Sequence, residues 1–350
     1  MLHTNYKVVI FSLFLSLLFV ACSPEDPLIN SGSVSWSSLV IFEGGTGISV
    51  VTLPSKNTST SVQLPPEVLQ NAAVKIAYFR DKIYVLSPQT FTMYIVQDKS
   101  FVILDTIKFD STNLKPTAIS FANATTAYIA HENQPVISIF DLTIKKVVST
   151  IAISTPSKDI SSFENQVYAV CPESNSVMVI DTRTNKITKT IETYDAPTFI
   201  GIDIDNRLVL VLCAGKGKTK DTLQNPVEKT RMKLAYIDPV DNSIVTQTDM
   251  IVIQANPSGA IPTSFAVTER YRAYVTTNQG MIRINTFTKS GAVRTSQSVF
   301  STVQYNIRRG EITLLQQRSN GSTIFTADRL TGTTIETHIF TTPIRSIFPI

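Results

Sequence analysis

Cysteine and histidine are both rare in this chain of 350 residues, which contains three of each. Cys22 ends an N-terminal apolar run, so the rest of the chain holds only Cys171 and Cys213. Two cysteines cannot build a disulfide-rich scaffold. Both end very apolar segments, VYAVC and LVLVLC, and we predict buried free thiols, since cysteine is among the most buried residue types. An oxidising compartment would also permit a bridge between neighbouring repeats.

Groups that carry catalysis or bind metals are equally sparse. His131 falls in the segment AHENQP, which we interpret as a solvated loop, and His338 in an outer strand, where we expect a structural role. A zinc site would need distant carboxylates, so we predict no metal and no cofactor. The segment GKGKT at 215–219 lacks the first glycine of a phosphate-binding loop, because Leu212 stands at that position. Without paired carboxylates or a nucleophile elbow, we expect no enzyme.

Charge of one sign is not concentrated anywhere in the sequence. The formal net charge is +4, and the chain has neither a basic block nor an acidic tail. A nucleic-acid-binding protein usually carries a basic patch, so we predict no nucleic-acid partner. The length suits one large β domain or two ordinary domains.

The N-terminus contains the one long apolar run. Lys7 precedes the uncharged residues 8–20, which are too few to cross a bilayer as a helix. They fit the apolar region of a secretory signal, and an ordinary cleaved signal is one alternative. The stretch FVAC at 19–22 resembles a bacterial lipobox, with Phe where that pattern prefers Leu. The resemblance implies that residues 1–21 are removed as a signal peptide and that Cys22 is lipidated.

Acidic residues and prolines follow this cysteine. The segment SPEDP at 23–27 is similar to the surface-export signal of Bacteroidetes lipoproteins, although a solvated tether explains it equally well. Residues 22–35 are expected to form a lipid-anchored flexible tether. The implied location is the outer membrane, lipid-anchored and surface-exposed, with a periplasm-facing orientation left open.

The rest of the chain repeats with a period of about forty residues. Pro116, Tyr128 and Asp141 recur as Pro156, Tyr168 and Asp181. Apolar residues mostly alternate, turn residues punctuate them, and no long helical periodicity follows. Four short strands per repeat of about 40 residues are typical of a β-propeller blade. We therefore predict an all-β fold with one β-propeller at 36–350, with seven four-stranded blades favoured over six or eight.

Two details of the repeat lead to further predictions. The C-terminal segment 342–350 is expected to form the innermost strand of the blade that contains 37–53, which closes the ring and leaves no open edge. Asp141, Asp181 and Asp238 share one repeat position, and we expect each to hold the turn between the third and fourth strands through local hydrogen bonds. They would then lie on three blades rather than in one site.

The segments AYVTTN at 273–278 and VYAVCPESNSVMVIDTRTNKI at 167–187 resemble the blades of YVTN-type bacterial propellers. The lipobox, the acidic leader, VIFEGGTG at 40–47 and an insertion at 214–233 are similar to a Bacteroidetes subset of surface propeller lipoproteins. Some members of that subset capture cobalamin and pass it to a TonB-dependent outer-membrane transporter. The resemblance therefore implies a corrinoid or another nutrient as ligand, and such a transporter as partner.

Propellers bind mostly through loops that the rigid scaffold presents. One face should gather the turns after the Tyr-centred strands and the links between blades. The ligand-binding candidates on that face are Phe91, His131, Glu132, Gln134, Tyr194, Asp195, Asn278, Gln279 and Arg318. The sequence thus predicts a non-enzymatic envelope lipoprotein that binds a large polar ligand. The alternative is a scaffold or adhesion propeller that binds another envelope protein or a glycan, which should show a flat exposed apolar patch.

Overall fold

The computed structural model describes residues 35–43, 47–65, 68, 74–109, 113–215, 230–249 and 260–350. The chain divides into two units, 1–34 and 35–350. The predicted signal peptide, Cys22 and nearly all of the predicted tether lie outside the described residues. Within them, no helix is long and apolar enough to span a membrane.

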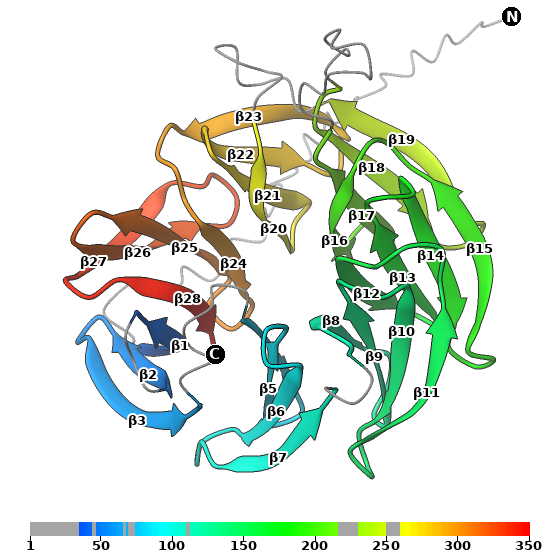
Figure 1. The fold of residues 1–350 in the computed structure, drawn as a ribbon. Helices are drawn as coiled ribbons and strands as arrows, with labels where there is room; N and C mark the ends of the chain where they lie inside the picture. The colour runs from blue at the N-terminus through cyan, green and yellow to red at the C-terminus, as the bar shows by residue number, and fades with distance from the viewer. Residues whose placement is uncertain are drawn as a thin grey trace, which may run out of the picture. The chain divides into compact units, whose positions relative to one another are not determined.

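The unit from residue 35 to residue 350 is built from 28 strands in seven antiparallel sheets of four strands, arranged as blades in a ring (Figure 1). We call the centre of this ring, which the inner strands surround, the channel. In each blade the first-named strand is the innermost. Blade I consists of β28 (Ile344–Pro349), β1 (Trp36–Phe42), β2 (Gly47–Leu53) and β3 (Asn57–Gln63). Blade II consists of β4 (Lys75–Phe79), β5 (Lys82–Ser87), β6 (Thr92–Gln97) and β7 (Ile103–Lys108). Blade III consists of β8 (Pro116–Phe121), β9 (Thr126–His131), β10 (Val136–Asp141) and β11 (Lys146–Ala152).

The remaining four blades follow in chain order. Blade IV consists of β12 (Asp159–Phe163), β13 (Gln166–Cys171), β14 (Ser176–Asp181) and β15 (Lys186–Glu192). Blade V consists of β16 (Pro197–Asp203), β17 (Leu208–Cys213), β18 (Lys233–Asp238) and β19 (Ser243–Asp249). Blade VI consists of β20 (Pro262–Thr268), β21 (Arg272–Thr277), β22 (Gly280–Asn285) and β23 (Ser290–Ser296). Blade VII consists of β24 (Thr302–Asn306), β25 (Glu311–Arg318), β26 (Gly321–Asp328) and β27 (Thr334–Phe340).

The ring closes as the sequence predicts. The C-terminal strand β28 pairs antiparallel with β1, with Leu39 opposite Phe348 and Val40 opposite Ile347. Blade I therefore contains both ends of the propeller, and the prediction of seven blades is confirmed. This pairing leaves no unpaired edge between the first and last blades.

Buried apolar side chains form seven clusters among the described residues, one between each pair of neighbouring blades. Tyr128 of β9, for example, packs with Val167 and Ala169 of β13. Each middle strand packs against one neighbouring blade on each face. The sequences of these strands are therefore nearly continuous apolar runs, such as QVYAVC. The outermost strands are largely exposed, as in KITKTIE.

The two cysteines lie in different clusters and are free thiols. Cys171 packs between blades III and IV, and Cys213 between blades IV and V. Burial raises the pKa of Cys171 to about 11 and that of Cys213 to about 12. The prediction of buried free thiols is confirmed, and neither thiol is a reactive nucleophile at neutral pH.

The recurring aspartates hold turns, also as predicted. Asp181 Oδ1 accepts hydrogen bonds from the backbone N–H groups of Arg183 at 3.0 Å and Thr184 at 2.9 Å. Asp141 and Asp238 accept equivalent backbone bonds in blades III and V. Blades VI and VII use Asn285 and Asp328 in the same way.

Buried tyrosines join each of three blades to the next one. The hydroxyl of Tyr168 in blade IV donates to Asn242 Oδ1 of blade V at 2.8 Å. Tyr128 of blade III bonds in the same way to Asn185 of blade IV. Tyr274 of blade VI donates instead to the Arg329 carbonyl of blade VII at 3.0 Å. These bonds fix the third-to-fourth-strand turn of one blade against the previous blade.

We expect Tyr168→Phe to lower the free energy of unfolding by about 1 kcal/mol, because it removes one hydrogen bond between blades and keeps the buried ring. Urea unfolding followed by circular dichroism measures the change. Tyr271→Phe is the control, since Tyr271 is partly exposed and its hydroxyl has no hydrogen bond in the described part of the chain. Equal unfolding free energies for the two variants would contradict a role for the bond.

Candidate functional site

Each blade sends two kinds of connection to the same side of the ring, because successive strands alternate in direction. These are the turns from the second to the third strand and the links from an outer strand to the next inner strand. We call this side the linker face. The described turns are 88–91, 132–135, 172–175, 278–279 and 319–320. The predicted insertion lies on the same face, between β17 and β18, and its residues 216–229 are outside the described part of the chain.

His131 differs from its predicted position. It is the last residue of β9 and has no exposed surface, so the interpretation as a solvated loop residue is wrong. Its Nε2 lies 2.8 Å from Ser138 Oγ, and its ring lies edge-on to Phe109. Burial lowers the pKa of His131 to about 4, against a smaller raising effect of the Lys115 backbone. A ligand on the surface cannot reach this ring.

His338 lies where the sequence places it, in the outer strand β27, and it is buried. Its Nε2 is 3.2 Å from Glu336 Oε2. A structural role is therefore confirmed for this histidine. Among the described residues, no group of three histidine, cysteine or acidic side chains is placed to hold a metal ion.

The other candidates lie on the linker face but come from several blades. Glu132 and Arg318 are exposed, at the ends of β9 and β25. Phe91 is half-buried beneath the Lys115 ammonium, 5.8 Å from the ring centre. Gln134 is also half-buried. These four residues are in blades II, III and VII, so they surround the channel rather than form one cluster.

The remaining candidates help to hold the loops in place. Asp195 Oδ1 accepts a hydrogen bond from Asn175 Nδ2 at 3.1 Å. The Lys233 ammonium lies over the Tyr194 ring, 4.5 Å from the ring centre. Asn278 Oδ1 accepts a bond from the Ile261 N–H at 2.8 Å. The Gln279 carbonyl accepts one from Arg294 at 2.7 Å. A ligand would therefore meet surfaces that are already organised.

A cavity of about 130 Å³ opens between the inner strands of blades II and III. Its polar groups are the ammonium of Lys75, the hydroxyl of Thr117 and the carboxylate of Asp159. Lys75 and Asp159 are the first residues of β4 and β12, so they lie at the channel mouth on the linker face. Apolar walls complete the cavity: Ile76, Ala77, Leu86, Ala118 and Ile119.

Asp159 is held firmly at this mouth. Its Oδ2 accepts the Ile200 N–H of blade V at 3.1 Å, and its Oδ1 accepts the Ile160 N–H at 3.0 Å. Burial raises the pKa of the carboxyl, and the charge of Lys75 acts in the opposite direction. The carboxylate therefore joins two blades and also faces a lysine.

Two lysines at the mouth repel each other. Burial lowers the pKa of Lys158, and the charge of Lys75 lowers it further, while Asp159 and Glu132 raise it. Neither ammonium has a hydrogen-bond or ion-pair partner within the described ranges. The two ammonium groups thus share the buried carboxylate of Asp159, and the exposed carboxylate of Glu132 also acts on Lys158.

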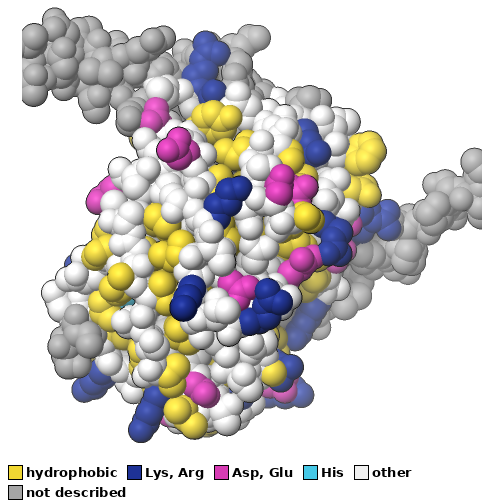
Figure 2. Space-filling model, turned by 90° about the vertical axis from the view of Figure 1, so that its right-hand side faces the viewer, with side chains coloured by type: hydrophobic (Ala, Val, Ile, Leu, Met, Phe, Trp, Pro, Cys, Tyr) yellow, Lys and Arg dark blue, Asp and Glu magenta, His cyan; other side chains and the backbone are white. Residues whose placement is uncertain are grey.

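Sequence reasoning missed Lys75, Lys158 and Asp159, because it searched the turns and not the inner strands. A signal was present in the polar residues that open KIAYF and KDISSF. Elsewhere, charge is dispersed: the side in Figure 2 shows basic and acidic side chains scattered among apolar ones, with no continuous field of one sign.

Comparison with known proteins defines the fold and no more. No family model matches the chain, and no curated protein matches it. The chain is a seven-bladed β-propeller. Similar solved structures include Kuenenia stuttgartiensis hydrazine synthase, with a TM-score of 0.57, 13% identity and coverage of 70% of this chain and 73% of that one. The Cps50 (Swd1) β-propeller domain of Myceliophteria thermophila matches with a TM-score of 0.56 and 12% sequence identity. The match covers 75% of this chain and 85% of that one. The dihydro-heme d1 dehydrogenase NirN matches with a TM-score of 0.54 and 8% sequence identity. The match covers 89% of this chain and 74% of that one.

Proposed function

We propose that this propeller is a non-enzymatic ligand-binding protein of the cell envelope and that it holds an anionic group of its ligand at the channel mouth. The observation that carries the proposal is the pair of ammonium groups of Lys75 and Lys158, which repel each other and have no hydrogen-bond or ion-pair partner among the described residues. A carboxylate or phosphate between them would relieve their repulsion. Both lysines are exposed at the linker face, so an anion can reach them from solvent.

The size of the cavity limits what enters it. Sites for drug-sized ligands usually measure about 300–1,000 Å³, so a cavity of about 130 Å³ admits only a small group. The bulk of a large ligand would lie across the linker face, over Phe91, Glu132 and Gln134. A corrinoid with a phosphodiester suits this arrangement, since the anion would enter the mouth and the amides would meet polar loops.

The sequence resemblances extend the proposal to location and partner. The lipobox at Cys22 and the acidic segment after it support a lipid-anchored protein of the outer membrane, exposed at the surface. We propose that the ligand is passed from the linker face to a TonB-dependent transporter.

We expect calorimetric titration with cyanocobalamin to give one-to-one binding. The Lys75→Ala, Lys158→Ala double variant should bind at least about tenfold more weakly, because two charge-assisted contacts are removed. Lys186→Ala is the matched control, since Lys186 is an exposed lysine at the start of β15. If titration of the unchanged chain with cyanocobalamin releases no heat, the corrinoid proposal is wrong. If the double variant and Lys186→Ala bind cyanocobalamin equally well, Lys75 and Lys158 are not part of the binding site.

A second function, a protein-binding scaffold, is favoured by the opposite face. Ile204 and Phe287 are 59% and 64% exposed there. The rings of Tyr271 and Phe287 are tilted against each other with centres 5.1 Å apart, and the Tyr271 N–H donates to Asp205 beside Ile204. An exposed apolar group of this kind is typical of protein interfaces. A transporter or envelope protein that binds the unchanged chain but not Phe287→Ser, with no cyanocobalamin binding, would favour the scaffold.

A further inference from the structure

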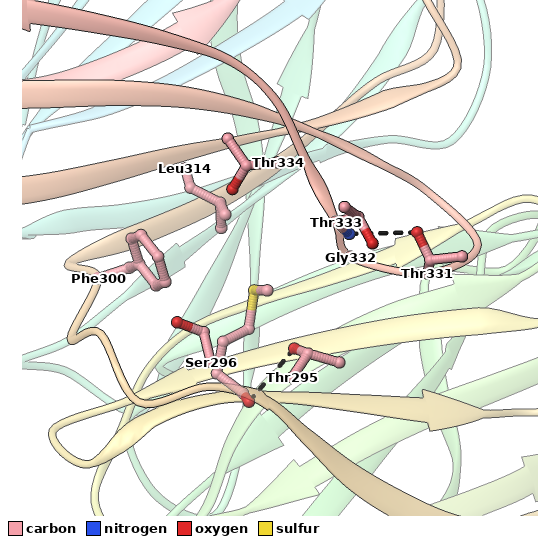
Figure 3. A pocket seen from close by; sticks show the side chains of 9 residues that line it. Thr295, Ser296, Phe300, Leu314, Thr331, Gly332, Thr333 and Thr334 are labelled. Atoms are coloured by element: carbon pink, nitrogen blue, oxygen red, sulfur yellow. Dashed lines mark hydrogen bonds between the residues drawn. The ribbon is translucent and has the colours of Figure 1, made fainter.

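A second cavity lies away from the channel, between blades VI and VII (Figure 3). Its volume is about 440 Å³, within the range of about 300–1,000 Å³ that small-molecule sites usually have. One wall is the turn from β26 to β27 with the start of β27, and the other is the end of β23. The cavity is independent of the linker-face proposal, because it shares no residue with the channel mouth.

The lining combines hydroxyl groups with an apolar floor. Five hydroxyls belong to Thr295, Ser296, Thr331, Thr333 and Thr334. Met281, Phe300 and Leu314 supply the apolar part. No lining residue is charged.

Part of this hydroxyl set is available to a ligand. Thr331 Oγ1 already donates to Asp328 and accepts from the Thr333 N–H. The hydroxyls of Thr333 and Thr334 have no hydrogen-bond partner among the described residues, and both threonines are exposed. Each hydroxyl has one donor and two acceptor positions, so this wall can pair with groups that both donate and accept.

One wall of the cavity includes a turn residue without a side chain, Gly332. Asn185 and Asn242 occupy the left-handed position of the third-to-fourth-strand turn in blades IV and V, and each bonds to a tyrosine of the previous blade. In blade VII the equivalent residue is Gly332, with φ of 74°. A Cβ there would lie 3.2 Å from Tyr274 and 3.5 Å from Met281. A side chain at this position would therefore extend toward Met281 and Thr295, two of the residues that line the cavity.

The outer strand of blade VI widens the same space. The pairing of β22 with β23 shifts register twice, near Met281 and between Arg283 and Asn285. The outer strands of the other blades each have one shift. A bulge bends the strand that carries it, so two bulges move β23 away from a regular path beside the turn of blade VII.

We propose that this cavity binds an uncharged sugar of one or two rings. Sugar hydroxyls both donate and accept, which matches Thr333, Thr334 and Ser296. The C–H face of a sugar ring is apolar, which matches Met281, Phe300 and Leu314. The absence of charge from the lining disfavours phosphorylated or acidic sugars, because nothing would pair with their charge once desolvated.

The test is saturation-transfer NMR with galactose, mannose and N-acetylglucosamine as probes. We expect the unchanged chain to transfer saturation to at least one of the three. Gly332→Asn should reduce the transfer about tenfold, because it places in blade VII the residue that fills this position in blades IV and V. Asn tolerates the left-handed backbone better than most residues, so the variant should fold. Thr334→Phe fills the cavity from the exposed start of β27 and should have the same effect.

The control is Thr337→Asn, an exposed position on β27 outside the cavity, which should leave the transfer unchanged. If Gly332→Asn fails to fold by circular dichroism, Thr334→Phe decides alone. The proposal is overturned if no sugar receives saturation from the unchanged chain. It is also overturned if Gly332→Asn or Thr334→Phe folds and transfers as much saturation to the sugar as Thr337→Asn does.

Discussion

Replacing Arg309 by Met is expected to lower the free energy of unfolding by about 3–5 kcal/mol. The guanidinium makes two bonds to the Glu311 carboxylate, at 2.9 and 3.1 Å. Only 13% of the Arg309 side chain and 7% of the Glu311 side chain are exposed. Without the arginine, a buried carboxylate loses its partner, and this is why the loss exceeds that of an ordinary surface pair.

The position of Arg309 adds to this effect. The guanidinium lies over the ring of Trp36 in blade I, 5.6 Å from the ring centre, and Glu336 of β27 is 3.8 Å away. The residue thus joins blade VII to the blade that closes the ring. The variant is expected to weaken that closure as well as the local pair.

Urea unfolding of three variants separates these contributions. Arg183→Met removes an ion pair with the same 2.9 Å separation, but Arg183 is 74% exposed, so little change is expected. The Arg309→Met, Glu311→Met double variant should recover much of the lost stability, because no buried charge is left unpaired. Equal effects of Arg309→Met and Arg183→Met would contradict the account.

Acidification is expected to remove about 3 kcal/mol of stability through His131 alone. Burial lowers the pKa of this ring to about 4, against 6.5 for an ordinary histidine. Between these values the unfolded chain binds a proton that the folded chain does not, so stability falls as the pH decreases from 6.5 to about 4. Above pH 6.5 His131 is neutral in both states and does not reduce the free energy of unfolding. Below about pH 4 it is protonated in both states, and the free energy of unfolding no longer changes through this residue. The difference between these two pKa values corresponds to about 3 kcal/mol of unfolding free energy.

The matched variant is His131→Gln, which keeps a hydrogen-bonding side chain beside Ser138 but cannot take up a proton in this range. The difference in unfolding free energy between the two proteins should shift by about 3 kcal/mol in favour of the variant between pH 7 and pH 4. A difference that stays constant with pH would show that the ring is accessible to protons in the folded state.

The sequence predicts the fold well because each blade repeats the same local pattern. Alternating apolar residues define the strands, the aspartates mark the turns, and the tail segment 342–350 needs a partner that the first strand provides. The strands and turns depend on neighbours within about forty residues, so the pattern of one repeat predicts that of the others. The seven blades and the ring closure follow directly.

The site is harder to predict because it depends on side chains from different blades. Lys75 and Lys158 meet only because the ring brings blades II and IV to one channel, and no local spacing reports that. His131 ends a strand that is buried on both faces, where alternation gives no sign of where the strand stops. The cavity beside Gly332 lies at a turn position that Asn185 and Asn242 occupy in blades IV and V, and this comparison requires the structure of the turns.

The most direct test of the central claim is an NMR titration of the Lys158 ammonium, with and without inorganic phosphate at constant ionic strength. We expect a pKa below the usual 10.5 in chloride, an increase when phosphate is added, and an increase in Lys75→Ala. That result would show that two lysines at the channel mouth repel each other and accept an anion. A usual pKa that responds neither to phosphate nor to the loss of Lys75 would contradict the proposed site.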